Sequence, residues 1–332
     1  MTNAVIVNSF GGPEVLQLSR VDQPSLKPGC ARVAVHATAL NRADLLQRQG
    51  HYPAPVGESD ILGLEMAGIV TEIAQDVPAA AGFRVGDRVM ALLPGGGYAE
   101  EAVVPVGLLM PVPEALTLVE AAAIPEVFLT AYSNLVWLGS MHADDRVLIH
   151  AGASGVGTAA IQLVKVLGGR SIVTAGTAEK RIFCEQLGAE KALDYHAGPF
   201  VSEVLSWSHN LGVHLIFDFV GGPYLAQNLR CLATDGRLIV IGTMGGRIAE
   251  QLDLGLLLSR RLQVIGTALR SRTLIQKMAL TREFADFALP LMERGELRPI
   301  VDKVFAFEEA AAAHEYMEAN HNIGKIVLQV RA

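Results

Sequence analysis

The sequence predicts an α/β protein in which a mostly antiparallel β domain accompanies a doubly wound sheet of six parallel strands. Short β-rich runs punctuated by Gly and Pro fill roughly the first 120 residues, where helix-length periodic segments are scarce. From about residue 126, six short apolar runs alternate with helical stretches. This alternation is typical of βαβ units, so the second half is expected to form a parallel sheet with helices on both faces.

Length and composition agree with two well-packed domains. The chain has 332 residues, about twice a typical domain of ~150 residues. Its content of 51% hydrophobic and 18% charged residues favours buried cores over disorder. The net charge of -7 argues against a nucleic-acid-binding face. No apolar run reaches the roughly 18 residues of a membrane span, and the N-terminus lacks the pattern of a secretory signal.

The three cysteines point to a reducing compartment. Cys30, Cys184 and Cys231 are odd in number and far apart in sequence, unlike the framework of a disulfide-rich secreted protein. We expect reduced, mostly buried thiols and a cytoplasmic protein.

The predicted strands and helices follow in chain order. The runs ARVAVHATAL, AGIVTEIA and DRVMALL are expected strands of the first domain. The six parallel strands are expected at RVLIHAG, SIVTAG, KALDY, VHLIFDFVG, GRLIVIG and LQVIGTAL, whose continuous apolar character suits strands covered on both faces. The remaining C-terminal residues contain two helical stretches and a last strand, GKIVLQV, and do not extend the alternation. We therefore assign residues 1–125 and 270–332 to one domain and residues 126–269 to the other.

The stretch HAGASGVG is the first candidate site. It follows the first parallel strand and opens a helix, which is the context of a dinucleotide-binding loop. Gly152 permits the turn, while Gly155 and Gly157 let the backbone approach a pyrophosphate. Ser154 stands where a G-x-G-x-x-G pattern has its middle glycine, and Val156 lies in the first turn of the helix. We expect all five to contact a dinucleotide cofactor, with the Ser154 hydroxyl bonding a phosphate or ribose.

The residues at the end of the second parallel strand indicate whether the cofactor is NADH or NADPH. An NAD-specific protein has Asp or Glu there for the ribose hydroxyls, whereas this chain has Gly176 followed by Thr177. Lys180 and Arg181 follow in the next helix, and a hydroxyl with two cations suits a 2′-phosphate. NADPH is therefore predicted, with Tyr195 flanking the adenine or the phosphate. The alternatives are a solvated helix face for the two cations and an ordinary strand residue for Tyr195.

Motifs along nearly the whole chain reveal a resemblance to a known family. They are LNRADLLQRQGHYP, LGLEMAGIV, VGDRVMAL, GGGYAE, AAIPEVFLTAY, VLIHAGASGVGTAAIQL, GTAEKR, DGRLIVIG and NIGKIVL. The chain resembles the zinc-free quinone oxidoreductase (zeta-crystallin-like) branch of the medium-chain dehydrogenase/reductase superfamily, and within it the tumour-suppressor-inducible type. The resemblance implies a GroES-like β domain, an inserted Rossmann domain, quinone reduction by NADPH, and a homodimer, or a tetramer, formed through LQVIGTAL.

The first motif holds the predicted catalytic residues. Asn41 stands where zinc-dependent relatives have a first cysteine ligand, and Leu64 replaces the histidine of their G-H-E triplet, so no metal is expected. Asn41 is a candidate donor to a developing oxyanion, Asp44 a candidate orienting group, and Tyr52 the candidate proton donor. The plainer alternatives are a helix-capping Asn and a surface Tyr.

The resemblance also implies further cofactor contacts. Thr130 is similar to the nicotinamide-side threonine of the family, and Gly242, Leu269 and Arg270 to the stretches that close over the nicotinamide ribose. Lys325 is a candidate cofactor contact, with an exposed cation on a terminal strand as the alternative.

Two other functions stay open at this point. An enoyl or enone reductase of the same superfamily would use the same hydride geometry. An NADPH-binding structural or RNA-binding protein, as the lens crystallins of the family suggest, would need no catalysis, although the acidic composition disfavours RNA.

Overall fold

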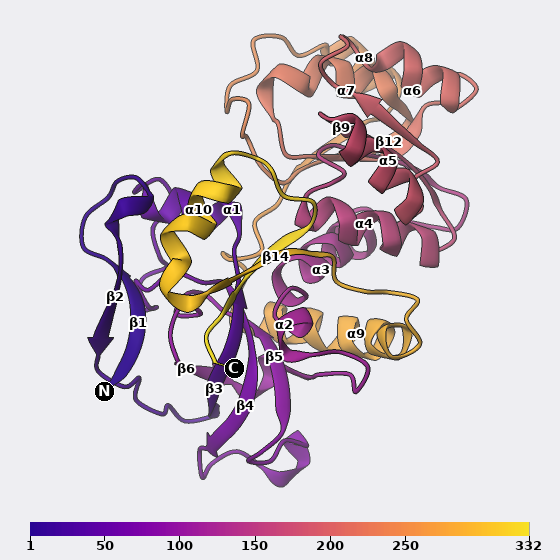
Figure 1. Ribbon diagram of the computed structural model, residues 1–332. Helices are drawn as coiled ribbons and strands as arrows, with labels where there is room; N and C mark the ends of the chain where they lie inside the picture. The colour runs from indigo at the N-terminus through magenta and orange to yellow at the C-terminus, as the bar shows by residue number, and fades with distance from the viewer. Residues whose placement is uncertain (332) are drawn as a thin grey trace. The chain divides into compact units, whose positions relative to one another are not determined.

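The computed structural model describes residues 1–331, and the chain forms two compact units (Figure 1). One unit comprises Met1–Leu129 and the segment that begins at Arg270, and the other comprises Thr130–Leu269. The division falls inside helix α3 (Pro125–Tyr132), whose first turn is bonded to the first unit through the Glu126 N–H.

The first unit is built on an antiparallel-rich sheet, as predicted. Strand β3 lies at its centre and pairs antiparallel with β4, β6 and β15, whereas β14 and β15 pair in parallel. The full order is β14-β15-β3-β4-β5-β7, and β1 and β2 form a separate hairpin. The strands are β1 (Thr2–Val7), β2 (Leu16–Val21), β3 (Cys30–Ala39), β4 (Glu65–Ile73), β5 (Arg88–Leu92), β6 (Glu101–Pro105), β7 (Leu109–Pro111), β14 (Val301–Ala306) and β15 (Lys325–Gln329).

The helices of this unit cover its sheet and fix its functional segments. Helix α10 packs beside β14 and β15, while α1 directly follows β3 (Figure 1). A buried apolar cluster that includes Leu40, Tyr98 and Ile326 joins these elements, so the C-terminal segment is part of the same core. The helices are α1 (Arg42–Arg48), α2 (Leu118–Ala121), α3, α9 (Leu274–Glu293) and α10 (Ala310–Glu318).

The second unit contains the six parallel strands that the sequence predicts. Their order is β10-β9-β8-β11-β12-β13, and every neighbouring pair is parallel. The strands are β8 (Arg146–Ile149), β9 (Arg170–Ala175), β10 (Lys191–Asp194), β11 (Val213–Asp218), β12 (Leu232–Val240) and β13 (Gln263–Gly266). The order reverses between β8 and β11, and a doubly wound sheet binds ligands at the carboxyl ends of its strands at such a reversal.

Burial explains why the inner strands are continuously apolar. Ile149, Ile172 and Ile216 on β8, β9 and β11 have no exposed surface, because helices cover both faces of the sheet. The helices are α4 (Gly155–Val166), α5 (Ala178–Leu187), α6 (Val201–Trp207), α7 (Leu225–Cys231) and α8 (Leu254–Ser259). Strand β13, at the sheet edge, differs in that most of its side chains are exposed.

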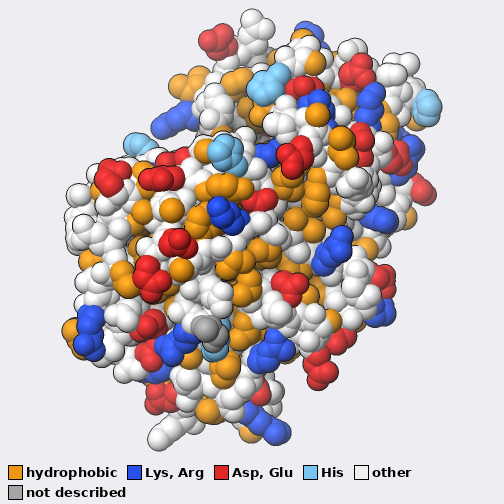
Figure 2. Space-filling view, in the orientation of Figure 1, with side chains coloured by type: hydrophobic (Ala, Val, Ile, Leu, Met, Phe, Trp, Pro, Cys, Tyr) orange, Lys and Arg blue, Asp and Glu red, His pale blue; other side chains and the backbone are white. Residues whose placement is uncertain are grey.

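The remaining surface properties agree with the composition. All three cysteines are free and buried, as predicted. Acidic and basic side chains are interspersed over the face shown in Figure 2, without a continuous basic field. Among residues 1–331, no helix has both the length and the hydropathy that a bilayer crossing requires.

Candidate functional site

The glycine-rich loop of the second unit is shaped by backbone contacts that exclude side chains. It connects β8 to α4, and Ser154 caps the helix by accepting a hydrogen bond from the Gly157 N–H at 3.1 Å. A Cβ at Gly152 would lie 2.7 Å from the Cβ of Val173, and one at Gly157 would lie 2.4 Å from the carbonyl oxygen of Ala151. Only glycine fits at these two positions.

The loop presents free donors at the edge where the strand order reverses. The N–H groups of Gly155 and Val156 lie in the first turn of α4, where a helix offers no internal acceptor. Together with the positive end of the helix, they suit an anion such as a pyrophosphate. Ala151 adopts a left-handed backbone conformation, with φ of 50°, that ordinary residues avoid. The residues of this loop therefore fit the dinucleotide that the sequence predicts.

The predicted selectivity residues lie together at the next strand end. A Cβ on Gly176 would meet the Tyr195 hydroxyl oxygen at 2.6 Å, so the missing side chain lets the tyrosine reach the end of β9. Thr177 caps α5 by accepting a bond from the Lys180 N–H at 3.2 Å, and the Lys180 side chain is largely buried. Arg181 forms an ion pair with Asp194 at 2.8 Å. Part of its charge is therefore balanced within the protein.

A buried histidine, which the sequence analysis did not single out, joins three of the parallel strands. His150 has no exposed surface, and its Nε2 lies 2.8 Å from Oδ1 of Asn228. The Asn228 amide donates to Asp218 at 3.1 Å, so its oxygen faces the histidine and Nε2 carries the proton. The other ring nitrogen then accepts from the Thr174 hydroxyl at 3.1 Å. Burial lowers the pKa of His150 and keeps it neutral, although Asp218 and Asn228 oppose this shift.

The other predicted cofactor contacts are placed as follows. Gly242 follows β12, and its N–H donates to the Asp218 carbonyl at 3.2 Å, so it lies at the same sheet edge as the glycine-rich loop. Leu269 follows β13 and is buried. Thr130 is a buried residue of helix α3.

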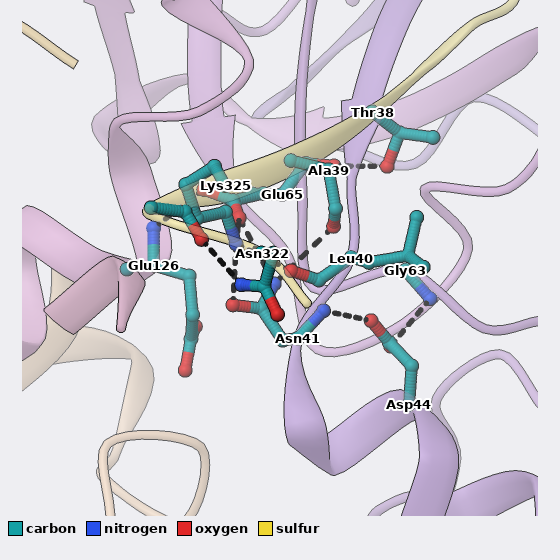
Figure 3. Close-up of polar contacts among 12 residues, drawn as sticks. Thr38, Ala39, Leu40, Asn41, Asp44, Gly63, Glu65, Glu126, Asn322 and Lys325 are labelled. Atoms are coloured by element: carbon teal, nitrogen blue, oxygen red, sulfur yellow. Dashed lines mark hydrogen bonds and ion pairs between the residues drawn. The ribbon is translucent and has the colours of Figure 1, made fainter. Parts of the chain in front are cut away.

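In the first unit, Asn41, Glu65 and Lys325 form a buried polar cluster (Figure 3). The Lys325 Nζ donates to Oδ1 of Asn41 and Oε1 of Glu65, each at 2.7 Å, and to the Leu40 carbonyl at 2.6 Å. Since an ammonium has three N–H donors, all of them are engaged. The Asn41 amide donates to Glu65 at 2.9 Å and to the Ala39 carbonyl at 3.3 Å, so both of its N–H donors are also engaged.

These bonds limit what Asn41 and Lys325 can do. A contact from either residue to an oxyanion or a cofactor would require an existing bond to break. Their geometry is that of groups that hold the ends of β3, β4 and β15 together. Asn41 also stands at the N-cap position of α1.

Asp44, the predicted orienting group, accepts hydrogen bonds from two segments of the first unit. One carboxylate oxygen accepts from the Asn41 N–H at 2.7 Å and the other from the Gly63 N–H at 3.1 Å. The Tyr98 hydroxyl donates to it at 3.4 Å. Asp44 is fully buried, and burial raises its pKa to about 6 although the two backbone bonds lower it.

A zinc ion does not fit this cluster. The ammonium of Lys325 places a fixed positive charge between the oxygens of Asn41 and Glu65. Across residues 1–331, no three His, Cys, Asp or Glu side chains are grouped so that they could hold a metal ion. No metal-assisted step can be derived from these residues.

Tyr52 and Arg270 lie against one another in the first unit. The Arg270 guanidinium lies 5.1 Å from the centroid of the Tyr52 ring, within the range of a cation–π contact. Arg270 also donates to Oε1 of Gln47 and to the Pro94 carbonyl, both at 2.8 Å. Burial and then the Glu126 carboxylate raise the pKa of Tyr52, while Arg270 lowers it. Arg270 therefore lies in contact with Tyr52, the predicted proton donor.

Glu126 is the titratable group of this region that the sequence analysis missed. Its backbone N–H donates to Oε2 of Glu65 at 2.8 Å, but its side chain points away from the cluster in Figure 3. Burial and the Glu65 carboxylate raise the pKa of Glu126 from 4.5 to about 8, against the effect of Lys325. The available signal was an acid after proline at a helix start, one turn before Thr130.

The chain is similar to proteins of known family over its whole length. Residues 27–114 match the alcohol dehydrogenase GroES-like domain, and residues 187–328 match a family described as zinc-binding dehydrogenase. The chain is 30% identical to the synaptic vesicle membrane protein VAT-1 homolog of Rattus norvegicus over 345 residues, which cover 98% of this chain and 83% of that protein.

Two solved structures show the same likeness. A quinone oxidoreductase from Pseudomonas syringae is 28% identical, with a TM-score of 0.88 over 99% of this chain and 100% of that one. The quinone oxidoreductase of Escherichia coli complexed with NADPH is 27% identical, with a TM-score of 0.86 over 99% of both chains.

Proposed function

The chain belongs to the zinc-free quinone oxidoreductase and VAT-1-like family of the medium-chain dehydrogenase/reductase superfamily, and from this we propose that it reduces quinones with NADPH. Its membership makes it an oxidoreductase. The loop between β8 and α4 is the main support for a dinucleotide cofactor. Glycine alone fits at two of its positions, and free N–H groups lie at the start of the helix that follows.

Three groups support NADPH over NADH. Gly176 leaves no carboxylate at the end of β9 to repel a phosphate, and Thr177 and Lys180 stand beside it. The likeness to an NADPH-complexed quinone oxidoreductase points the same way. In this proposal Gly155 and Val156 hold the pyrophosphate, and Thr130 lies beside the nicotinamide. When bound, NADPH supplies a hydride from its nicotinamide ring.

The buried cluster of the first unit suits an acceptor that needs no Lewis acid. A quinone accepts a hydride readily, because the resulting charge spreads over an aromatic ring. The Asn41–Glu65–Lys325 cluster fixes the starts of α1 and α3, which carry the polar side chains of the site. Its role is therefore to position those helices, while Tyr52 and Arg270 form an aromatic and cationic surface for the acceptor.

Steady-state rates with NADPH test the proposal. We expect 1,2-naphthoquinone and 1,4-benzoquinone to be reduced. NADH should be used with at least about tenfold lower kcat/KM, because a lost hydrogen bond to the charged 2′-phosphate costs about 1.5 kcal/mol or more. An enoyl thioester preferred by a hundredfold in kcat/KM would refute the quinone assignment and favour the enoyl reductase alternative.

We propose that the protein is a homodimer that pairs through strand β13. This strand ends the six-stranded sheet and leaves its outer edge open within residues 1–331. Val264 on the strand is 44% exposed, and Leu254 and Leu258 on the adjoining helix α8 are 66% and 79% exposed. An open edge flanked by exposed apolar side chains is a template for pairing with a second copy.

A further inference from the structure

We propose that Glu126 is the catalytic acid, which donates the proton to the anion that hydride addition leaves on the acceptor. The inference rests on the proposed function and assigns one of its steps to a residue. It replaces Tyr52 in that role and does not depend on which acceptor is natural.

The backbone of Glu126 is fixed while its carboxyl group is left available. Its N–H is bonded to Glu65, which is itself held by Lys325 and Asn41. The side chain extends from the first turn of α3 away from these three residues (Figure 3). Among residues 1–331, no hydrogen bond or ion pair reaches the Glu126 carboxyl, and the residue is only partly buried. A carboxyl group that is carried on a fixed backbone and is itself unpaired and reachable suits proton transfer to a bound molecule.

Charged groups from several elements face this carboxyl. Glu65 on β4 and Asp44 on α1 are acidic, whereas Lys325 on β15 and Arg270 are basic. Tyr52 and Lys277, on the loop after α1 and on α9, also interact with it. A position in the first turn of a helix normally favours the charged form of an acid. Here burial and Glu65 outweigh that effect and raise the pKa to about 8, so the carboxyl keeps its proton at neutral pH.

The other acidic groups of the region are less suited than Glu126 to donate this proton. Burial raises the pKa of Tyr52, which makes its hydroxyl a weaker proton donor than an ordinary phenol. Asp44 is fully buried, and both of its oxygens accept backbone bonds. Lys277 remains a competitor, because burial lowers the pKa of its ammonium, and the test must separate it from Glu126.

When bound, NADPH would supply a hydride with its electron pair to the acceptor, which would become an anion. The O–H bond of the Glu126 carboxyl breaks as an O–H bond forms on the anion, leaving a Glu126 carboxylate and a neutral reduced product. A water-derived proton then restores the acid, since the side chain is partly exposed.

The pH dependence of kcat distinguishes this role from a structural one. For the wild type we expect kcat to be constant up to about pH 7 and to fall above about pH 8, because the protonated form is required. Glu126→Gln should lower kcat about a hundredfold and abolish the fall at high pH. Glu114→Gln, which changes an exposed acid of the same unit, should alter neither. If Glu126→Gln retains the fall, or if Lys277→Met alone removes it, Glu126 is not the acid.

A second readout needs no cofactor or substrate. The folded protein binds the Glu126 proton up to about pH 8, while the unfolded chain releases it near 4.5. Stability should therefore decline as pH rises between these values and level off above them. The melting temperature of Glu126→Gln relative to the wild type should increase across the same window. A constant difference would overturn the neutral-acid assignment.

Failure of the proposal and failure of the proposed function give different results. A wild-type protein that oxidises no NADPH with any quinone or enone contradicts the function, and the melting experiment still tests the proton on Glu126. A wild-type reductase whose Glu126→Gln variant keeps full kcat at neutral pH contradicts the inference alone.

Discussion

The substitution Lys325→Met tests the buried cluster on which the site geometry depends. Lys325 is 3% exposed and Glu65 is fully buried, and their charged atoms lie 2.7 Å apart. Methionine preserves most of the side-chain volume but removes the charge. Glu65 would then keep a buried negative charge whose remaining donors are the Asn41 amide and the Glu126 N–H.

Breaking one partner of a buried ion pair costs about 3–5 kcal/mol. For a unit of this size, about 2–4 °C of melting temperature corresponds to 1 kcal/mol, so we expect a decrease of about 10 °C. Glu65→Gln alone should also be destabilising, because it leaves the ammonium without its counter-charge. The double variant should lose at least about 1 kcal/mol less than the sum of the two single losses.

Urea unfolding of the four proteins in this double-mutant cycle measures these quantities. All four proteins should be unfolded at the same pH, buffer and ionic strength. If Lys325→Met costs less than about 1 kcal/mol, or if the single losses add, the pair is not the buried ionic contact described.

Three further predictions concern other parts of the chain. Ser154→Gly removes a helix cap and should lower the stability by only a few tenths of a kcal/mol, with NADPH affinity within about threefold of the wild type. Gly155→Val should weaken NADPH binding at least about a hundredfold, because its side chain blocks the approach of the phosphates; equal affinities of the two variants in a fluorescence titration would show that this loop does not bind the pyrophosphate. His314 is buried beside Arg48, and burial lowers its pKa from 6.5 to about 3. The wild type should therefore lose stability as pH falls through this window, and His314→Gln should lose less; identical acid-denaturation curves for the two proteins would refute the buried neutral state of His314. Val264→Lys places a charge on the edge strand and should give a monomer in light scattering; an unchanged mass would exclude pairing through β13.

Much of the fold could be predicted because each buried surface leaves a local pattern in the sequence. Helices on both faces make the inner parallel strands continuously apolar, and all six were recognised. The glycine loop was recognised for a similar reason, since close backbone contacts at Gly152 and Gly157 admit no side chain. The parallel pairing of β14 with β15 was not predicted, because it depends on where the C-terminal segment packs.

The buried polar contacts could not be predicted, because they join residues far apart in sequence. Lys325 was assigned to the cofactor, but its position relative to Asn41 and Glu65 arises only when β15 pairs with β3. The unusual protonation of Glu126 has the same origin, since it depends on burial and on a carboxylate sixty-one positions away. His150 and Asn228 likewise meet only in the folded sheet.

Single-turnover kinetics measure whether the protein transfers a hydride from NADPH to a quinone. The protein is mixed with 1,2-naphthoquinone and NADPH deuterated at the transferred position of nicotinamide C4, without oxygen. We predict that one NADPH is consumed for each quinone reduced, that deuterium slows the reaction, and that Gly155→Val shows neither. NADPH consumption no faster than in the absence of protein would show that the protein does not catalyse this hydride transfer.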